Sequence, residues 1–369
     1  MATITGLAFI SNAVNGLTLQ LEVVSPNGPA FKISEKPEMP QIKLRASVCG
    51  GDAAANKTAW FDWSVTLRHE SPACRHQTAS NNTSHNPLNA RTFGGDWTIP
   101  FKDIRGGKLE VTVKTTAKAA GGKLTPLSVV SKDLRIVGTN PAITTLSTTI
   151  PNNVLKQIAR HESSLRQFLD SRDGACACPY FSEDGKGGVG LFQITNPLPS
   201  ADEIWNWRKN LERAKAMFAE KHAAAKGYPG QCRKDPVFID LVRQFIEQQQ
   251  TEFVAEKKKA NPQAKELVPP HFQVVLPEYN DDELYDDTIR AFNGYGGVDN
   301  LGHRGRLHEF EVPIVPGDEG DMLDARVGAD GKTATLQWQR VDPRRRRYDD
   351  GRPIGDPDYV ANVKKQPLF

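Results

Sequence analysis

The residue best suited to chemistry in this chain of 369 residues is a glutamate at the end of an apolar stripe. Val154, Ile158 and Leu165 recur at helical spacing, and Glu162 lies on or beside the face that they define. Because burial disfavours the ionised form of a carboxyl group, a glutamic acid on that face would keep its proton near neutral pH, as a general acid must. The alternative is a glutamate at the edge of the stripe that points into solvent.

Three further segments follow Glu162-Ser163 in order. They are Gly190-Leu191-Phe192-Gln193, Ala291-Phe292-Asn293-Gly294-Tyr295 and Tyr359-Val360. This ordered set resembles the soluble lytic transglycosylase and goose-type lysozyme group of the lysozyme superfamily, over roughly residues 145–365. In that group a helix ends in Glu-Ser, a Gly-Leu-(Met/Phe)-Gln segment lines the cleft, and an Ala-(Tyr/Phe)-Asn helix end closes the sugar site.

The resemblance implies a mainly α-helical lysozyme-like domain that cleaves peptidoglycan between N-acetylmuramic acid and N-acetylglucosamine. Glu162 would be the catalytic acid/base of an oxocarbenium-like transition state. No cofactor and no metal are expected. The residues that the resemblance assigns to substrate binding are Ser163, Gly190, Gln193, Asn293, Tyr295 and Tyr359.

A second carboxylate would separate a hydrolase from a lytic transglycosylase. Asp184 lies six residues before Gly190, the spacing of an aspartate in goose-type lysozymes, whereas the group's other aspartate would fall near Thr195 and is absent. An inverting hydrolase needs a carboxylate to position water. A transglycosylase needs only one acid/base, because the 6-hydroxyl of the sugar attacks. Lytic transglycosylase is therefore favoured, and a muramidase that uses Asp184 is the alternative. Asp184 could also belong to a solvated turn.

Two other groups of residues give weaker signals. Cys176 and Cys178 lack partner ligands at the spacing that zinc requires, so a disulfide bond from one of them to Cys232 is the more plausible prediction. Trp205 and Trp207 either stack on sugars or anchor a helix in the core.

The elements that must position these residues indicate a multidomain α+β protein. Over residues 1–140, apolar and polar residues alternate between glycine-rich turns, which predicts an all-β sandwich of immunoglobulin-like type that serves delivery, docking or wall binding. Residues 141–150 form a Thr/Ser-rich linker. A mainly α-helical domain follows at 151–369, with an insertion around 226–280. Its expected helices cover about 152–170, 201–226, 235–259 and 281–293.

Composition excludes several function classes. With 47 Lys+Arg against 44 Asp+Glu, the net charge of +3 indicates neither a disordered polyelectrolyte nor a nucleic-acid binder. No run of 18 apolar residues predicts a membrane span. The first residues lack the basic start and unbroken apolar run of a signal peptide. We therefore expect synthesis in the cytoplasm without a Sec signal, and action in the periplasm or cell wall of a target cell after secretion.

Peptidoglycan is the expected partner. A peptidoglycan enzyme without a leader resembles a fused antibacterial effector of the type VI secretion system. That resemblance implies a secretion spike or tail protein as carrier and an immunity protein in the producer. A phage-borne lysin is an alternative route to the same substrate. The non-enzymatic alternative is a structural module that binds glycan without cutting it.

Overall fold

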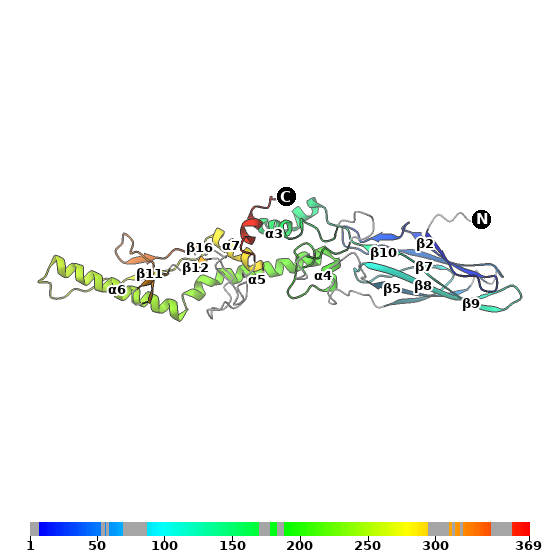
Figure 1. Ribbon diagram of the computed structural model, residues 1–369, viewed down its shortest axis with the longest axis horizontal. Coiled ribbons are helices and arrows are strands. Elements are labelled where there is room, and N and C mark those ends of the chain that lie inside the picture. The colour runs from blue at the N-terminus through cyan, green and yellow to red at the C-terminus, as the bar shows by residue number, and fades with distance from the viewer. Residues whose placement is uncertain are drawn as a thin grey trace. The chain divides into compact units, whose positions relative to one another are not determined.

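The computed structural model divides into two compact units, one of residues 1–214 with 368–369 and one of residues 215–367. Figure 1 shows the elements of both units. No helix in the part of the chain that the structure describes combines the length and apolar character of a membrane span. The structure describes residues 7–52, 56, 59–68, 87–169, 178–182, 188–293, 310–311, 314–317, 320–340 and 356–369.

Two sheets build the N-terminal region of the first unit. One has the strand order β1-β2-β4-β7; the other has the order β3-β10-β8-β5-β6, with β9 also paired to β8. Neighbouring strands are antiparallel except for β3 and β10. The strands are β1 (Leu7–Ile10), β2 (Thr18–Ser25), β3 (Ala30–Lys32), β4 (Lys43–Cys49), β5 (Trp60–Arg68), β6 (Leu88–Phe93), β7 (Asp96–Thr98), β8 (Gly107–Lys118), β9 (Leu124–Val130) and β10 (Leu134–Val137).

The alternation of side chains along these strands explains why the two sheets pack on each other. Along β5, Phe61 and Trp63 are buried, whereas Trp60 and Asp62 are exposed, because successive side chains point to opposite faces of a sheet. The buried faces of both sheets join in one hydrophobic cluster, which includes Leu21 from the first sheet and Trp63 from the second. The predicted strand-rich region is therefore confirmed, and its immunoglobulin-like type stays a prediction.

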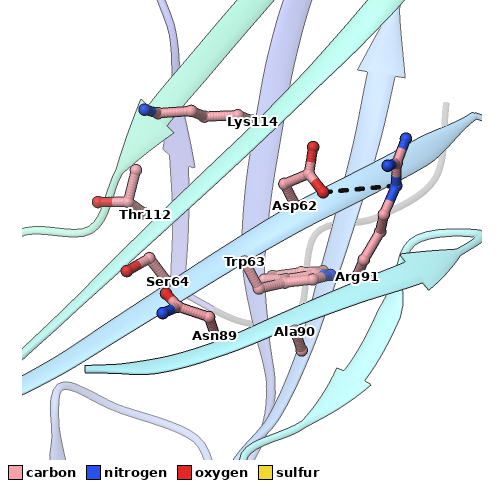
Figure 2. A pocket seen from close by; sticks show the side chains of 8 residues that line it. All are labelled: Asp62, Trp63, Ser64, Asn89, Ala90, Arg91, Thr112 and Lys114. Atoms are coloured by element: carbon pink, nitrogen blue, oxygen red, sulfur yellow. Dashed lines mark ion pairs between the residues drawn. The ribbon is translucent and has the colours of Figure 1, made fainter. Parts of the chain in front are cut away.

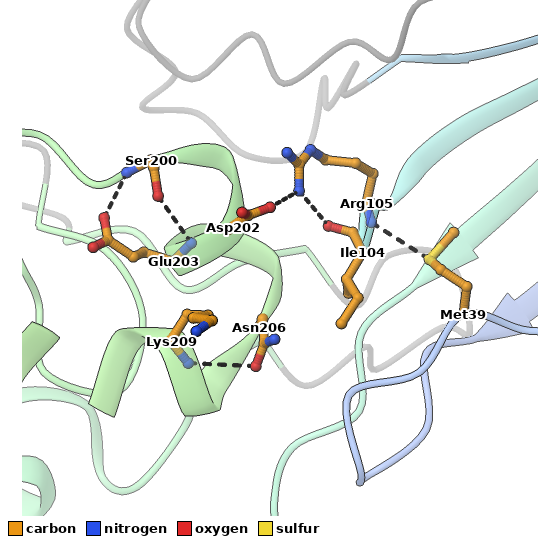
Figure 3. Close-up of polar contacts among 8 residues, drawn as sticks. All are labelled: Met39, Ile104, Arg105, Ser200, Asp202, Glu203, Asn206 and Lys209. Atoms are coloured by element: carbon orange, nitrogen blue, oxygen red, sulfur yellow. Dashed lines mark hydrogen bonds and ion pairs between the residues drawn. The ribbon is translucent and has the colours of Figure 1, made fainter. Parts of the chain in front are cut away.

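A helical segment packs against this strand region within the first unit. Phe168 and Trp205 belong to the same hydrophobic cluster as the strands. The ring of Trp205 covers Gly106 so closely that an added Cβ would lie 2.1 Å from it. Arg105 forms an ion pair with Asp202 (Figure 3). The elements here are α2 (Ile143–Thr149), α3 (Asn153–Ser163), α4 (Ala201–Trp205) and the start of α5 (Trp207–Cys232).

The linker and the domain boundary observed in the structure differ from those predicted. Helix α2 occupies most of the segment 141–150, where a linker was predicted. The compact units divide after residue 214 instead of near 140. The physical reason is that Phe168, Ile204 and Trp205, which follow β10 in the chain, are buried in the core of the strand region.

The second unit has a small core of its own. Leu241 and Phe245 of α6 (Pro236–Ala260) pack in one cluster with Leu276 and Trp338. Helix α6 lies within the predicted insertion 226–280, and it supplies this core. The remaining elements are β11 (Gln273–Val275), α7 (Asp281–Phe292), β12 (Phe310–Glu311), β13 (Ile314–Gly317), β14 (Gly320–Leu323), β15 (Thr333–Thr335), β16 (Gln339–Arg340) and α8 (Tyr359–Lys364).

Candidate functional site

Helix α3 carries the candidate acid Glu162 in its last turn. The side chain of Asn152 caps the start of the helix by accepting a hydrogen bond from the Leu155 amide at 2.7 Å. Ile158 lies one turn before Glu162 and is fully buried, while Glu162 itself is half-buried. The helix ends at Ser163, because the next residue adopts a left-handed conformation with φ 53°. The carboxyl group therefore lies at the edge of the buried face.

The segment Gly190–Gln193 forms a buried turn beside the end of α3. The buried hydroxyl of Ser163 donates a hydrogen bond of 2.8 Å to the Leu191 carbonyl. It also accepts one of 3.1 Å from the Arg166 amide. The structure thus brings together two of the motifs that the sequence singled out, Glu162-Ser163 and Gly190–Gln193, although they are separated by 26 residues.

Two further buried side chains hold this turn, and the sequence analysis missed both. Gln167 accepts a hydrogen bond of 2.9 Å from the Leu191 amide and donates one of 2.8 Å to the Ile204 carbonyl. Asn210 accepts from the Phe192 amide at 3.1 Å and donates to the Val189 carbonyl at 3.1 Å. A buried turn needs partners for its peptide groups. These two amide side chains supply them and fix the turn in place.

Gly190 is required by this packing. Its φ of +75° lies in the left-handed region, and an added Cβ would meet the Gln167 amide at 2.5 Å. A glycine has no Cβ and adopts this conformation without strain. The glycine that the sequence assigned to substrate contact therefore has a structural role in allowing the turn to approach Gln167.

The side chain of Gln193 is directed inward, onto its own turn. Its Nε2 donates to the Gly190 carbonyl at 2.8 Å and to the Tyr180 carbonyl at 3.3 Å. Its Oε1 is buried and has no hydrogen-bond partner in the described part of the chain. The resemblance implies that this amide contacts a sugar. Because Nε2 is already bonded within the turn, such a contact would require the buried Oε1 to become accessible to the sugar.

Asn293 and Tyr359, the other candidate residues that the structure describes, lie in the second unit. Asn293 follows the last residue of α7, and its Nδ2 is buried without a hydrogen-bond partner among the described residues. Tyr359 begins α8 and is buried. Helices α7 and α8 pack together, with Lys364 donating to Asp286 at 2.6 Å. Partial burial lowers the pKa of Lys364, but the hydrogen bonds and charges of Asp286 and Asp282 together raise it more, so the net shift is upward.

Several sequence predictions fall outside the described residues or are corrected by the structure. Asp184 and Tyr295 lie outside those residues, as does Cys176. Cys178 forms a disulfide bond. The predicted disulfide bond from Cys232 to Cys176 or Cys178 is wrong, because the thiol of Cys232 is not part of a disulfide bond.

The two tryptophans that the sequence left open have structural roles. Trp205 and Trp207 are both buried. Trp207 donates a hydrogen bond of 2.8 Å from its indole nitrogen to the Glu35 carbonyl. In the described ranges, no three side chains of His, Cys, Asp or Glu are grouped closely enough to hold a metal ion.

Comparison of the chain with protein-family models, with characterised proteins and with solved structures gives no match. The resemblance to the lysozyme superfamily therefore rests on the motif residues alone.

Proposed function

We propose that this protein cleaves the glycan strands of peptidoglycan, with Glu162 as the general acid/base. The observation that supports this most is the hydrogen bond of 2.8 Å from Ser163 to Leu191. It joins the helix end that carries the carboxyl group to the Gly-Leu-Phe-Gln turn, the pair of motifs that lines the cleft in the group that the sequence resembles. A half-buried glutamic acid held at a rigid helix end is suited to donate a proton to a bound glycosidic oxygen.

In the proposed reaction, Glu162 protonates the oxygen that leaves as the 4-hydroxyl of N-acetylglucosamine. The bond to C1 of N-acetylmuramic acid breaks through an oxocarbenium-like transition state. The 6-hydroxyl of the same muramic acid then attacks C1 and returns its proton to the Glu162 carboxylate. The product is a 1,6-anhydro sugar, and no water is consumed.

Lytic transglycosylation is favoured over hydrolysis because one carboxyl group suffices for it. The position near which a second aspartate would stand holds Thr195. The alternative is a muramidase in which Asp184 positions the attacking water. The two reactions leave different chain ends, a 1,6-anhydro end or a reducing end, and mass spectrometry of the released fragments distinguishes them.

Digestion of purified peptidoglycan sacculi tests the proposal. We expect the wild type to release soluble muropeptides and Glu162→Gln to lower the rate by about 100-fold or more, since a general acid contributes at least that factor. Glu212→Gln is the matched control, because Glu212 is an exposed glutamate on α5, paired with Lys209 at 2.8 Å. No release by the wild type would overturn the enzymatic proposal in favour of a glycan-binding module.

An antibacterial role is the second part of the proposal, and it follows from the proposed substrate, because a bacterium whose glycan strands are cut loses the wall that resists its osmotic pressure. We expect the protein to lyse a Gram-negative host when a signal peptide directs it to the periplasm, and to be harmless when made in the cytoplasm. Glu162→Gln should abolish the lysis. Equal toxicity in both compartments would contradict this role.

A further inference from the structure

The outer face of the larger sheet carries side chains in ordered rows. The rows are defined by the antiparallel register of β6, β5 and β8, in which Asp62 is opposite Arg91 on one side and Lys114 on the other. In the neighbouring row, Ser64 is opposite Asn89 and Thr112. All of these side chains point away from the hydrophobic core, because they alternate with the buried residues of each strand.

Two aromatic rings stand at one end of these rows. Trp60 and Phe93 are directly opposite in the register, and their ring centroids lie 5.1 Å apart in an edge-to-face arrangement. They remain 50% and 61% exposed, respectively. The Arg91 guanidinium lies over the Trp60 ring at 5.3 Å from its centroid. Large aromatic rings of this kind are usually buried, so an exposed pair next to polar groups indicates a binding surface.

A hollow of about 600 Å³ lies on the charged and polar rows (Figure 2), and the register places the Trp60–Phe93 pair in the next row. Asp62 and Arg91 line it and form an exposed ion pair at 3.5 Å. Lys114 also lines it, and its side-chain ammonium group has no hydrogen bond or ion pair with any residue that the structure describes. The hollow thus offers hydroxyl, amide, carboxylate and ammonium groups within reach of an apolar platform.

The charges on this face favour an anionic ligand. In the three rows from Trp60–Phe93 to Ser64 on β5, β6 and β8, two residues are positive, Arg91 and Lys114, and one is negative, Asp62. An excess of one charge on a surface attracts polymers of the opposite charge.

We propose that this face, named here the Trp60 face and defined by the three rows from Trp60–Phe93 to Ser64, binds the glycan strand of peptidoglycan. A pyranose ring presents C–H groups to an aromatic ring and hydroxyl groups to neighbouring polar side chains. The carboxylates of the stem peptides meet Arg91 and Lys114. The choice of peptidoglycan among anionic glycans rests on the proposed function, whereas the binding itself does not require Glu162.

Co-sedimentation with insoluble sacculi tests this proposal, with the full-length protein in the Glu162→Gln background so that bound strands are not cut. We expect Trp60→Ala to weaken binding by about tenfold, as for a central aromatic contact. Ile10→Ala is the matched control, because Ile10 is 61% exposed on β1 of the other sheet. Its binding should equal that of the parent.

A second variant keeps the test informative if Trp60→Ala fails to fold. Lys114→Gln removes an exposed charge without breaking a bond within the described residues, and it should weaken binding and reduce its dependence on salt. Unchanged sacculus binding by folded Trp60→Ala and Lys114→Gln would overturn the proposal. The exposed face would then be assigned to binding of a protein partner. Equal binding of the parent to neutral chitin would overturn the choice of an anionic glycan.

The outcome is separable from that of the proposed function. A wild type that fails to cut sacculi, together with a Glu162→Gln protein that binds them through Trp60, contradicts the cleavage and supports the Trp60 face. A wild type that cuts, together with Trp60→Ala that binds normally, contradicts the Trp60 face alone.

Discussion

Substitution of Gly190 by alanine tests how the turn beside Glu162 is held. The φ of +75° at Gly190 makes alanine less favourable by about 1–2 kcal/mol. The new Cβ would also lie 2.5 Å from Gln167 Nε2, which must move. Its movement breaks the hydrogen bonds to the Leu191 amide and the Ile204 carbonyl. At about 1 kcal/mol for each bond, the expected loss in the free energy of unfolding is about 3–4 kcal/mol in total.

Urea unfolding followed by circular dichroism measures this loss, and Gly16→Ala is the control. Gly16 has nearly the same φ, +73°, but an added Cβ there has no atom within 4 Å. The control should therefore lose only the conformational cost of about 1–2 kcal/mol. Adding Gln167→Ala to Gly190→Ala should cost less than the sum of the two single changes, because they act on one contact. Equal losses for Gly190→Ala and Gly16→Ala would refute the close packing of the turn on Gln167.

Three further predictions concern side chains that form hydrogen bonds with the backbone. Ser163→Ala leaves the buried Leu191 carbonyl without its donor and should lower stability by about 1–3 kcal/mol; an unchanged thermal midpoint would contradict this. Asn152→Ala removes the cap of α3 and should lower the free energy of unfolding by about 1 kcal/mol, measured by thermal unfolding as for Ser163→Ala. A negligible change would contradict the capping role of Asn152. Hydrogen bonds from Thr333 and Lys332 lower the pKa of Asp330 to about 2, so its stabilisation is present above pH 3.8 and lost as the pH falls toward 2. Asp330→Asn should therefore unfold at nearly the wild-type midpoint at pH 2 but below it at pH 5, and equal differences at both pH values would contradict the assignment.

The helices were predictable where their ends carry local signals. The expected helices at 235–259 and 281–293 are confirmed as Pro236–Ala260 and Asp281–Phe292. Asp235 caps the first helix, and a reciprocal pair of Asn280 and Glu283 caps the second. Residues next to each helix start therefore predict where it begins. The helix expected at 152–170 ends instead at Ser163, because Ser164 and Leu165 adopt left-handed conformations that neither residue type signals.

The candidate site was predictable only in its motif residues. Glu162 and Gly190 stand out in the sequence by type and order, but their positioning residues do not. Gln167 and Asn210 resemble ordinary surface amides in the sequence, and their partners are 24 and 18 residues away, respectively. Such bonds form only once the chain has folded, so no local sequence pattern predicts them. The one available signal for buried hydrogen-bonding roles was the presence of these uncharged amides among large apolar residues.

The tryptophan ring that covers Gly106 has a consequence for how this chain can change during evolution. Because Trp205 and Phe168 complete the core of the strand region, that region cannot be replaced by another domain without exposing these two rings. A recombination event that replaced residues before 140 would have to supply a matching surface for both rings, or bring the segment up to 214 with it. The strand region and the helix that carries Glu162 are therefore expected to be inherited together, as one evolutionary unit.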